Sequence, residues 1–274
     1  MPKQSVVIIE AGKVDSGYWR ELWQYRELIY FLAWRDILVR YKQTLIGVLW
    51  ALIRPVLTML VFTIIFGKLA KLPTDNIPYP LLVFSAMVPW QFFSNAFSET
   101  GNSLISNSNI ISKVFFPRLV IPSSVILVSF VDFLIAAGLL SIMMVWYGVI
   151  PDWRIATLPA FVLMLAGAAL GTGLWLAALS AKYRDFKYIV PFLVQFGLYL
   201  SPVGFSSSII PEQWRLLYSF NPMTGIIDGF RWALLGTGSL TSSGLTLSAS
   251  LILLILATGL RYFRQTERSL ADSL

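Results

Sequence analysis

The chain has 274 residues, of which 57% are hydrophobic and only 13% are charged, which excludes an ordinary soluble protein and indicates a polytopic membrane protein. The net charge of +7 is then explained by Lys and Arg kept on the cytoplasmic side of a membrane, so nucleic acid is not an expected partner. The chain contains no Cys and no His, which excludes disulfides, thiol chemistry and the usual near-neutral proton carrier.

The chain begins with a polar segment over residues 1–26. It contains acidic side chains and no sustained apolar core, so we expect a cytoplasmic segment rather than a signal peptide. An amphipathic helix is predicted over 27–44, with Asp36 and Arg40 four residues apart and able to pair. Its apolar face consists of Phe31, Trp34, Leu38 and Tyr41. This helix is expected to lie in the cytoplasmic interface, either as a working element or as a simple anchor.

Six segments are apolar enough to be predicted as membrane spans, since about 20 apolar residues cross a bilayer. They are 45–67, 80–97, 119–146, 158–181, 188–205 and 245–263. The second and fifth are marginal in length. The predicted fold is all-α, with a six-span permease domain over 45–264 and a cytoplasmic tail over 265–274.

The distribution of positive charge predicts the orientation of these spans. We count thirteen Lys and Arg residues on the side of the two termini, against five on the opposite side. Since cytoplasmic loops carry an excess of Lys and Arg, both termini are expected to be cytoplasmic.

Two cytoplasmic connections stand out. The loop over 98–118 has a polar middle that includes Asn107 and Lys113, with a possible short helix over 104–114. It is either a docking element or a plain connection. The other connection, SAKYRDFK over 180–187, places four charges between two uncharged stretches. It is either a topology anchor or a short strut near an entrance.

The external segment over 209–235 is apolar in stretches but carries several charges, which would be costly in a lipid-facing span. Two short re-entrant helices are predicted, separated at Asn221 and Pro222 and dipping into the outer interface. Trp214 and Tyr218 suit that depth, because aromatic side chains favour the headgroup region.

Two charged residues fall inside predicted spans. Asp132 is either a structural, neutralised partner or a proton relay, because an intramembrane carboxylate is a functional candidate by default. Arg54 either extends toward the cytoplasmic headgroups or lines a polar portal where it meets a lipid phosphate.

Aromatic side chains recur on the second and fifth predicted spans. Those that we single out are Trp90, Phe93, Phe192, Phe196 and Tyr199. Such residues are usually lipid-facing or part of the core. They can instead line a pathway for sugar rings, whose C–H faces stack on aromatic rings.

Motifs for catalysis are missing from the sequence. There is no GxxxxGK[ST] phosphate loop and no HExxH motif, and without His there is no Ser-His-Asp triad. ATP binding by the phosphate-loop route is therefore excluded for this chain.

Three stretches together resemble the permease subunit of type-2 ATP-binding-cassette exporters, in the branch that exports O-antigen, capsule and teichoic acid. They are RYKQTLIGVLWALIRPVL (40–57), YRDFKYIVPFLVQFGLYLSPV (183–203) and IPEQWRLLYSFNPMTGIIDGFRWALLG (210–236). The family commonly has Phe where Tyr183 stands, which keeps the aromatic ring. It has a more neutral residue where Arg54 stands, so no role for Arg54 follows from the resemblance.

The resemblance implies a bacterial inner-membrane assembly of two permease chains and two separately encoded ATPase subunits, which bind ATP and Mg²⁺, so this chain needs no cofactor of its own. The substrate would be a lipid-linked polysaccharide. Residues expected to couple to the ATPase are Asp36, Arg40, Asn107, Lys113, Tyr183, Arg184 and Asp185. Residues expected at the channel are Arg54, Trp90, Phe93, Phe192, Phe196 and Tyr199. Residues expected at an external gate are Trp214, Tyr218, Asn221, Pro222 and Met223.

Other functions remain open. Within the same family, the substrate can be a smaller lipid or a drug. An ATP-independent secondary transporter would depend on Asp132 and would move substrate without a partner. A membrane enzyme such as a lipid-linked sugar transferase would need a carboxylate or metal site near the interface, and no convincing cluster is visible in the sequence.

Overall fold

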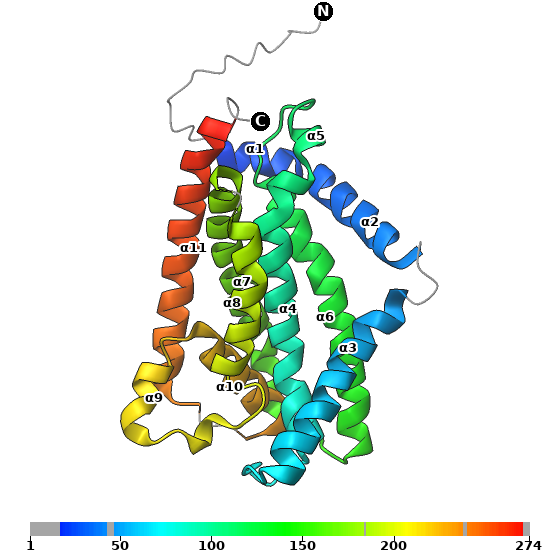
Figure 1. The fold of residues 1–274 in the computed structure, drawn as a ribbon, viewed down its shortest axis with the longest axis vertical. Helices are drawn as coiled ribbons and strands as arrows, with labels where there is room; N and C mark the ends of the chain where they lie inside the picture. The colour runs from blue at the N-terminus through cyan, green and yellow to red at the C-terminus, as the bar shows by residue number, and fades with distance from the viewer. Residues whose placement is uncertain (1–16, 43–46, 184, 238–239, 271–274) are drawn as a thin grey trace, which may run out of the picture.

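The structure, a computed structural model, describes residues 17–42, 47–183, 185–237 and 240–270, which form helices joined by short connections (Figure 1). The helices along the long axis are α3 (Gly47–Phe62) with its π-helical continuation η1 (Thr63–Leu69), α4 (Tyr79–Ser106), α6 (Val120–Trp146), α7 (Leu158–Lys182), α8 (Phe186–Leu200) and α11 (Ser242–Leu270). The shorter ones are α1 (Tyr18–Gln24), α2 (Arg26–Lys42), α5 (Ser108–Ile111), η2 (Trp153–Thr157), η3 (Ser207–Ile209), α9 (Glu212–Tyr218) and α10 (Pro222–Leu235). The described part is therefore all-α, as predicted.

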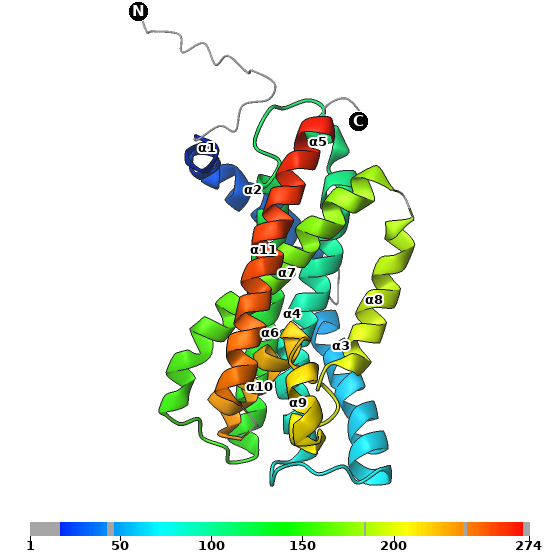
Figure 2. The ribbon, with the colours of Figure 1, turned by 90° about the vertical axis from the view of Figure 1, so that its left-hand side faces the viewer.

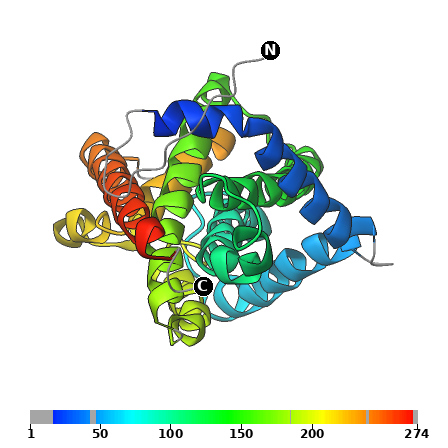
Figure 3. The same cartoon turned by 90° about the horizontal axis from the view of Figure 1, so that it is seen from above.

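The two ends of the bundle carry different elements. At one end lie α1, α5, the corner between α7 and α8, and the C-terminal end of α11, while α9 and α10 lie at the other (Figures 1 and 2). Helix α2 slopes from the first end along α6 toward the start of α3 (Figures 1 and 3). The elements expected to be cytoplasmic therefore gather at one end, away from the elements expected to be external.

Helix α4 is the central helix of the bundle and packs against α3, α6, α7, α8 and α10. Its first turns are buried on all sides, and it also buries the hydroxyl groups of Ser85, Thr100 and Ser103. Because neighbouring helices shield its first turns, α4 does not need the continuous apolar surface of a lipid-facing span. This position explains why the second predicted span has a weak hydropathy signal.

Four helical segments among the described residues are long and apolar enough to cross a membrane. They are Leu52–Leu69, Val120–Trp146, Trp153–Lys182 and Ser242–Glu267. Helix α4 is long but more polar, and α8 has only 15 residues. The prediction of six spans is therefore supported for the first, third, fourth and sixth and stays a prediction for the other two.

Several predicted boundaries differ from the structure; α11, for example, runs over Ser242–Leu270 rather than 245–263 and includes part of the predicted tail. Helix α4 continues through Ser106, because Thr100, Gly101, Ser103 and Leu104 form a buried stripe. The loop predicted over 98–118 is therefore helical in its first part, and the short helix predicted over 104–114 shrinks to α5.

The predicted fifth span stops at Leu200 rather than at residue 205. Ser201 is extended (φ −95°, ψ 153°) because it precedes Pro202, and the residue before a proline disfavours the helical conformation. The predicted start of the first span, at residues 45–46, lies outside the described residues.

Helices α7 and α11 make a close backbone contact. A Cβ atom on Gly171 would lie 2.8 Å from the backbone nitrogen of Leu256, and one on Gly259 would lie 2.4 Å from the carbonyl oxygen of Gly171. Only glycine allows two helices to approach this closely, as is common in membrane proteins.

Candidate functional site

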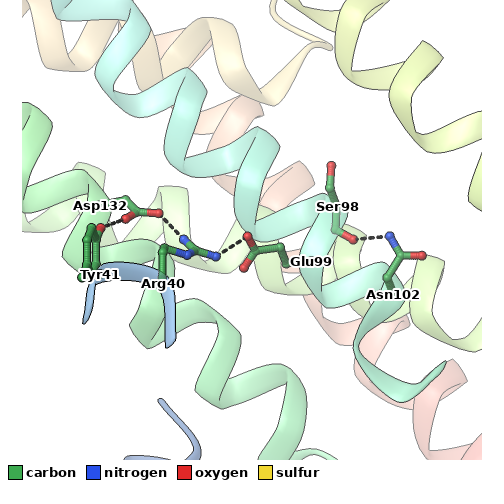
Figure 4. A network of polar contacts seen from close by, with 6 residues as sticks. All are labelled: Arg40, Tyr41, Ser98, Glu99, Asn102 and Asp132. Carbon is green, nitrogen blue, oxygen red and sulfur yellow. Dashed lines mark hydrogen bonds and ion pairs between the residues drawn. The ribbon is translucent and has the colours of Figure 1, made fainter. Parts of the chain in front are cut away.

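A polar network joins the end of α2 to α4 and α6. The guanidinium of Arg40 donates to Glu99 on α4 and to Asp132 on α6, and the Tyr41 hydroxyl donates to the second oxygen of Asp132 (Figure 4). In the next turn of α4, the Asn102 amide donates to the carbonyl oxygen of Ser98 at 3.0 Å. Three helices far apart in the sequence are thus held by one arginine.

The charges in this network are unequal, because two carboxylates share one guanidinium. Burial alone would lower the pKa of Arg40, but the carboxylates of Glu99 and Asp132 raise it above its ordinary value. Burial and the hydrogen bond to Asp132 raise the pKa of Tyr41. Arg40 therefore stays charged and Tyr41 stays neutral at physiological pH. Asp132 is an ion-pair partner of Arg40 in this structure, which is compatible with the structural role, one of its two predicted roles.

Asp36 and Arg40 do not pair as predicted, since each binds another partner. Asp36 pairs with Arg35 at 2.7 Å, and Arg35 also donates to the Asn107 side chain at 3.2 Å. The reason is the direction of the Arg40 side chain, which points toward α4 and α6, where it meets the carboxylates of Glu99 and Asp132. Of the predicted coupling residues, Asp36, Arg40 and Asn107 are thus joined in one region.

The other predicted coupling residues lie on the surface of the same end. Lys113 is exposed just after α5, and Tyr183 and Asp185 are exposed in the corner between α7 and α8. Lys182 lies 5.3 Å above the ring of Tyr183. Arg184 lies outside the described residues.

The predicted channel residues separate into two groups. Phe192, Phe196 and Tyr199 lie on an exposed face of α8, with more than half of each side chain accessible. Trp90 is buried, and a Cβ atom on Gly197 of α8 would lie only 2.8 Å from its ring. Phe93, on the next turn of α4, is partly buried beside Trp90, with 5.7 Å between ring centroids. Trp90 of α4 therefore packs against α8 at Gly197.

Arg54 lies in the first half of α3, and its side chain is exposed. Thr58, one turn later, donates to the Arg54 carbonyl oxygen at 3.0 Å. This placement is compatible with both predicted roles, because an exposed arginine near the start of a span can reach headgroups or a bound phosphate.

The predicted external break forms at Asn221 and Pro222, between α9 and α10. The Asn221 side chain accepts from the Met223 N–H at 3.0 Å, which caps α10, and Pro222 is the first helical residue. Asn221 also donates to the Ser201 hydroxyl at 3.0 Å, and Tyr218 donates to the Leu200 carbonyl oxygen at 2.8 Å. The turn thereby holds the C-terminal end of α8.

The remaining gate residues differ in exposure. Met223 is buried, whereas 54% of Trp214 is exposed on α9. An exposed tryptophan at this end is compatible with the headgroup region of a membrane, and its place there stays a prediction.

Arg231 on α10 holds the non-helical segment that follows α8. Its side chain is fully buried and donates to the carbonyl oxygens of Leu82, Val203 and Phe205 at 2.9–3.3 Å. The Tyr79 hydroxyl donates to the Gly204 carbonyl oxygen in the same segment. Irregular backbone away from water needs such partners, because an unpaired carbonyl there is costly.

Sequence reasoning assigned no role to Glu99 and treated Arg231 only as one charge among several. Glu99 stood in a predicted loop, where a charged residue attracts no attention. Helix α4 continues through Ser106, so Glu99 lies within a packed helix rather than in a loop. A partly buried carboxylate favours a nearby cation, and this preference is the signal that could have pointed to Glu99.

Among the described residues, no group of three or more Asp and Glu side chains is arranged to hold a metal ion. The polar groups gathered here are ion pairs and backbone caps, which hold neighbouring helices together. Long apolar helices with such internal pairs define a multi-pass membrane protein.

Comparison with known families places the protein within that class. The model of the ABC-2 type transporter family matches residues 27–235, and the chain therefore belongs to this family. The match confirms the resemblance to permease subunits of type-2 ATP-binding-cassette exporters.

Several curated proteins are similar along most of their length. The chain is 29% identical over 215 residues to the O-antigen export system permease protein RfbA of Myxococcus xanthus, covering 77% of this chain and 82% of that protein. It is 25% identical to an RfbA protein of Klebsiella pneumoniae, over 90% of this chain and 95% of that protein. It is 23% identical to the polysialic acid transport protein KpsM of Escherichia coli, over 87% and 93%.

Proposed function

We propose that this chain is the channel-forming permease of an ATP-driven exporter that moves a lipid-linked polysaccharide out of the cytoplasm across the bacterial inner membrane. The observation that carries the proposal is the similarity, over 77–90% of the chain, to proteins named for O-antigen export and polysialic acid transport. The orientation proposed has six crossings and both termini in the cytoplasm. The supporting observations are the excess of Lys and Arg on the terminal side and the gathering of those segments at one end of the bundle (Figure 2).

ATP and Mg²⁺ are bound by two separately encoded ATPase subunits in this proposal. The motion of the ATPase subunits is passed to three elements of this chain: the amphipathic helix α2, the α5 region, and the corner between α7 and α8. Two contacts support this role: Arg35 joins α2 to Asn107 beside α5, and Arg40 joins α2 to α4 and α6. A displacement of α2 would therefore act on three parts of the bundle.

A second copy of the chain completes the channel. The exposed aromatic face of α8 and the exposed apolar face of α3 are surfaces for that copy and for the sugar chain. Phe192, Phe196 and Tyr199 offer rings to sugar C–H faces, and Arg54 offers a cation to a lipid phosphate. The hairpin of α9 and α10 forms the external gate.

The competing functions predict other behaviour. Asp132 motivated an ATP-independent transporter, but it binds Arg40 and Tyr41 in this structure. A smaller lipid or drug substrate is an alternative within the family, because the chain is also 27% identical over 200 residues to a protein of Escherichia coli named only as inner membrane transport permease YadH.

The experiment is ATP-dependent transfer of a lipid-linked glycan in inverted membrane vesicles that contain the chain with or without its partner ATPase subunit. We expect transfer only with both subunits and ATP. Alanine at Phe196 and Tyr199 should reduce transfer while the protein remains folded. Alanine at Leu163, a 73% exposed residue of α7, is the matched control and should not. Transfer without the ATPase, or transfer of small lipids but no glycan, would contradict the proposal.

A further inference from the structure

A small polar cavity lies at the external end, between α9, α10 and the start of α11. It is lined by Ser219, Thr224, Asp228, Thr241 and Gly244, among others. Its volume of about 20 Å³ admits one particle of the size of a water molecule or a single ion. It is too small for a sugar or a lipid headgroup.

Asp228 supplies the charge of this cavity. Only 5% of Asp228 is exposed, and its Oδ1 atom is buried without a hydrogen-bond partner among the described residues. Ser207 hydrogen-bonds the carboxylate, and therefore does so through the other oxygen. Arg231, one turn away on α10, directs its N–H groups to backbone carbonyl oxygens. A buried carboxylate oxygen left without a partner is unfavourable, which points to a missing ligand.

The hydroxyl groups around Asp228 can serve as oxygen ligands for a cation. The Ser219 hydroxyl donates its hydrogen to the Arg215 carbonyl oxygen at 2.9 Å, and the Thr224 hydroxyl donates to the Tyr218 carbonyl oxygen at 3.4 Å. Both oxygens therefore present lone pairs to the cavity. The Thr241 hydroxyl accepts from the Gly244 N–H at 3.3 Å and can turn either a lone pair or its hydrogen to the cavity. A cation needs only the oxygen lone pairs, whereas a water molecule would also use the Thr241 hydrogen.

Glycine keeps the opposite wall of the cavity open. A Cβ atom on Gly244 would lie 2.8 Å from the Thr241 hydroxyl oxygen and 3.0 Å from the Ser219 hydroxyl oxygen. A side chain at this position would therefore occupy the space that a bound ion needs, which makes Gly244 a useful site for a test variant.

We propose that this cavity binds one monovalent cation, such as Na⁺, through the carboxylate of Asp228 and the hydroxyl oxygens of Ser219 and Thr224. Asp228, Asp75 and Arg231 interact electrostatically, two carboxylates with one guanidinium, so one added positive charge balances the group and a divalent ion would exceed it. The ion ties α9 to α10 at the external end. The site is independent of the proposed transport, because its ligands come from this chain alone.

The test is thermal unfolding of the full chain in detergent, in NaCl or in choline chloride at equal ionic strength. Sodium should raise the melting temperature saturably, by roughly 3–5 °C at ten times its dissociation constant. In Asp228→Asn the dependence on sodium should disappear, because the amide donates to the oxygens that the ion would bind. Gly244→Ala should remove it by filling the cavity.

Glu212→Gln is the matched control, since the Glu212 side chain is 91% exposed on α9. It should keep the full response to sodium. Equal melting temperatures of the native chain in the two salts would overturn the proposal and leave water as the occupant. A response retained in Asp228→Asn would overturn it too. If Asp228→Asn fails to fold, the response of Gly244→Ala decides.

Discussion

Arg40 in the last turn of α2 and Asp132 in α6 form an ion pair across 92 positions of the chain. The same guanidinium reaches Glu99 on α4, so the interface helix is attached to two helices of the bundle by one side chain (Figure 4). Asp132 is 12 residues from the start of α6, and α2 descends beside α6 to meet it. The carboxylate is thus placed beside an interface helix rather than alone in lipid.

Replacing Arg40 should destabilise the protein, because two partly buried carboxylates lose their cation. We expect Arg40→Gln to cost about 1–3 kcal/mol, less than a fully buried pair because the side chains are partly exposed. The measurement is the free energy of unfolding in detergent. Arg26→Gln, on the exposed side of the same helix, is the control and should change it little.

The double variant Arg40→Gln with Asp132→Asn should be more stable than Arg40→Gln alone, because one of the two uncompensated carboxylates is removed while Glu99 remains. If the two substitutions were simply additive, the ion pair would not be the cause of the loss.

Arg231 should not tolerate lysine. The guanidinium forks to Leu82, Val203 and Phe205, whereas an ammonium is a compact charge on a flexible stem and cannot span these carbonyl oxygens. We expect Arg231→Lys to cost about 2–4 kcal/mol, since buried acceptors are left unpaired. Thermal unfolding measures the loss, and protease cleavage within residues 201–211 should increase. Arg54→Lys, at an exposed position, should unfold like the native chain.

Asn221 has two functions that substitutions can separate. Asn221→Asp keeps the acceptor that caps α10 but loses the donor to Ser201, whereas Asn221→Ala loses both. We expect Asn221→Ala to cost about 1–2 kcal/mol and Asn221→Asp less. Melting temperatures in parallel samples give the order. Equal losses in the two variants would mean that the contact with Ser201, rather than the cap, dominates, because both variants lose that contact.

Two helical glycines should respond in opposite directions to alanine. Gly171→Ala would place a methyl group 2.8 Å from the backbone of Leu256, so α7 and α11 must separate and the melting temperature should fall. A methyl group on Gly138 in α6 would meet no neighbouring element within 4 Å, so alanine there should be neutral or stabilise by about 0.5–1 kcal/mol. A similar fall for both variants would exclude close packing as the cause.

Local features of this protein could be predicted because the residues that produce them are neighbours in the chain. Asn221 and Pro222 start α10 through contacts within three residues, and the break between α9 and α10 was predicted from them. Composition and the long apolar runs determined the class of protein and four of its spans. The orientation still depends on charge counting.

Tertiary structure alone decided which charged groups meet. Asp36 and Arg40 have the spacing of a helical pair, yet stronger partners lie on other helices and Arg40 turns to them. The weak apolarity of α4 is also explained only by the tertiary structure, since neighbouring helices rather than lipid surround it. Sequence determined where helices begin, how apolar they are and what family they form. Only the packing decided which buried charges are paired, because pairing depends on distances between residues far apart in the chain.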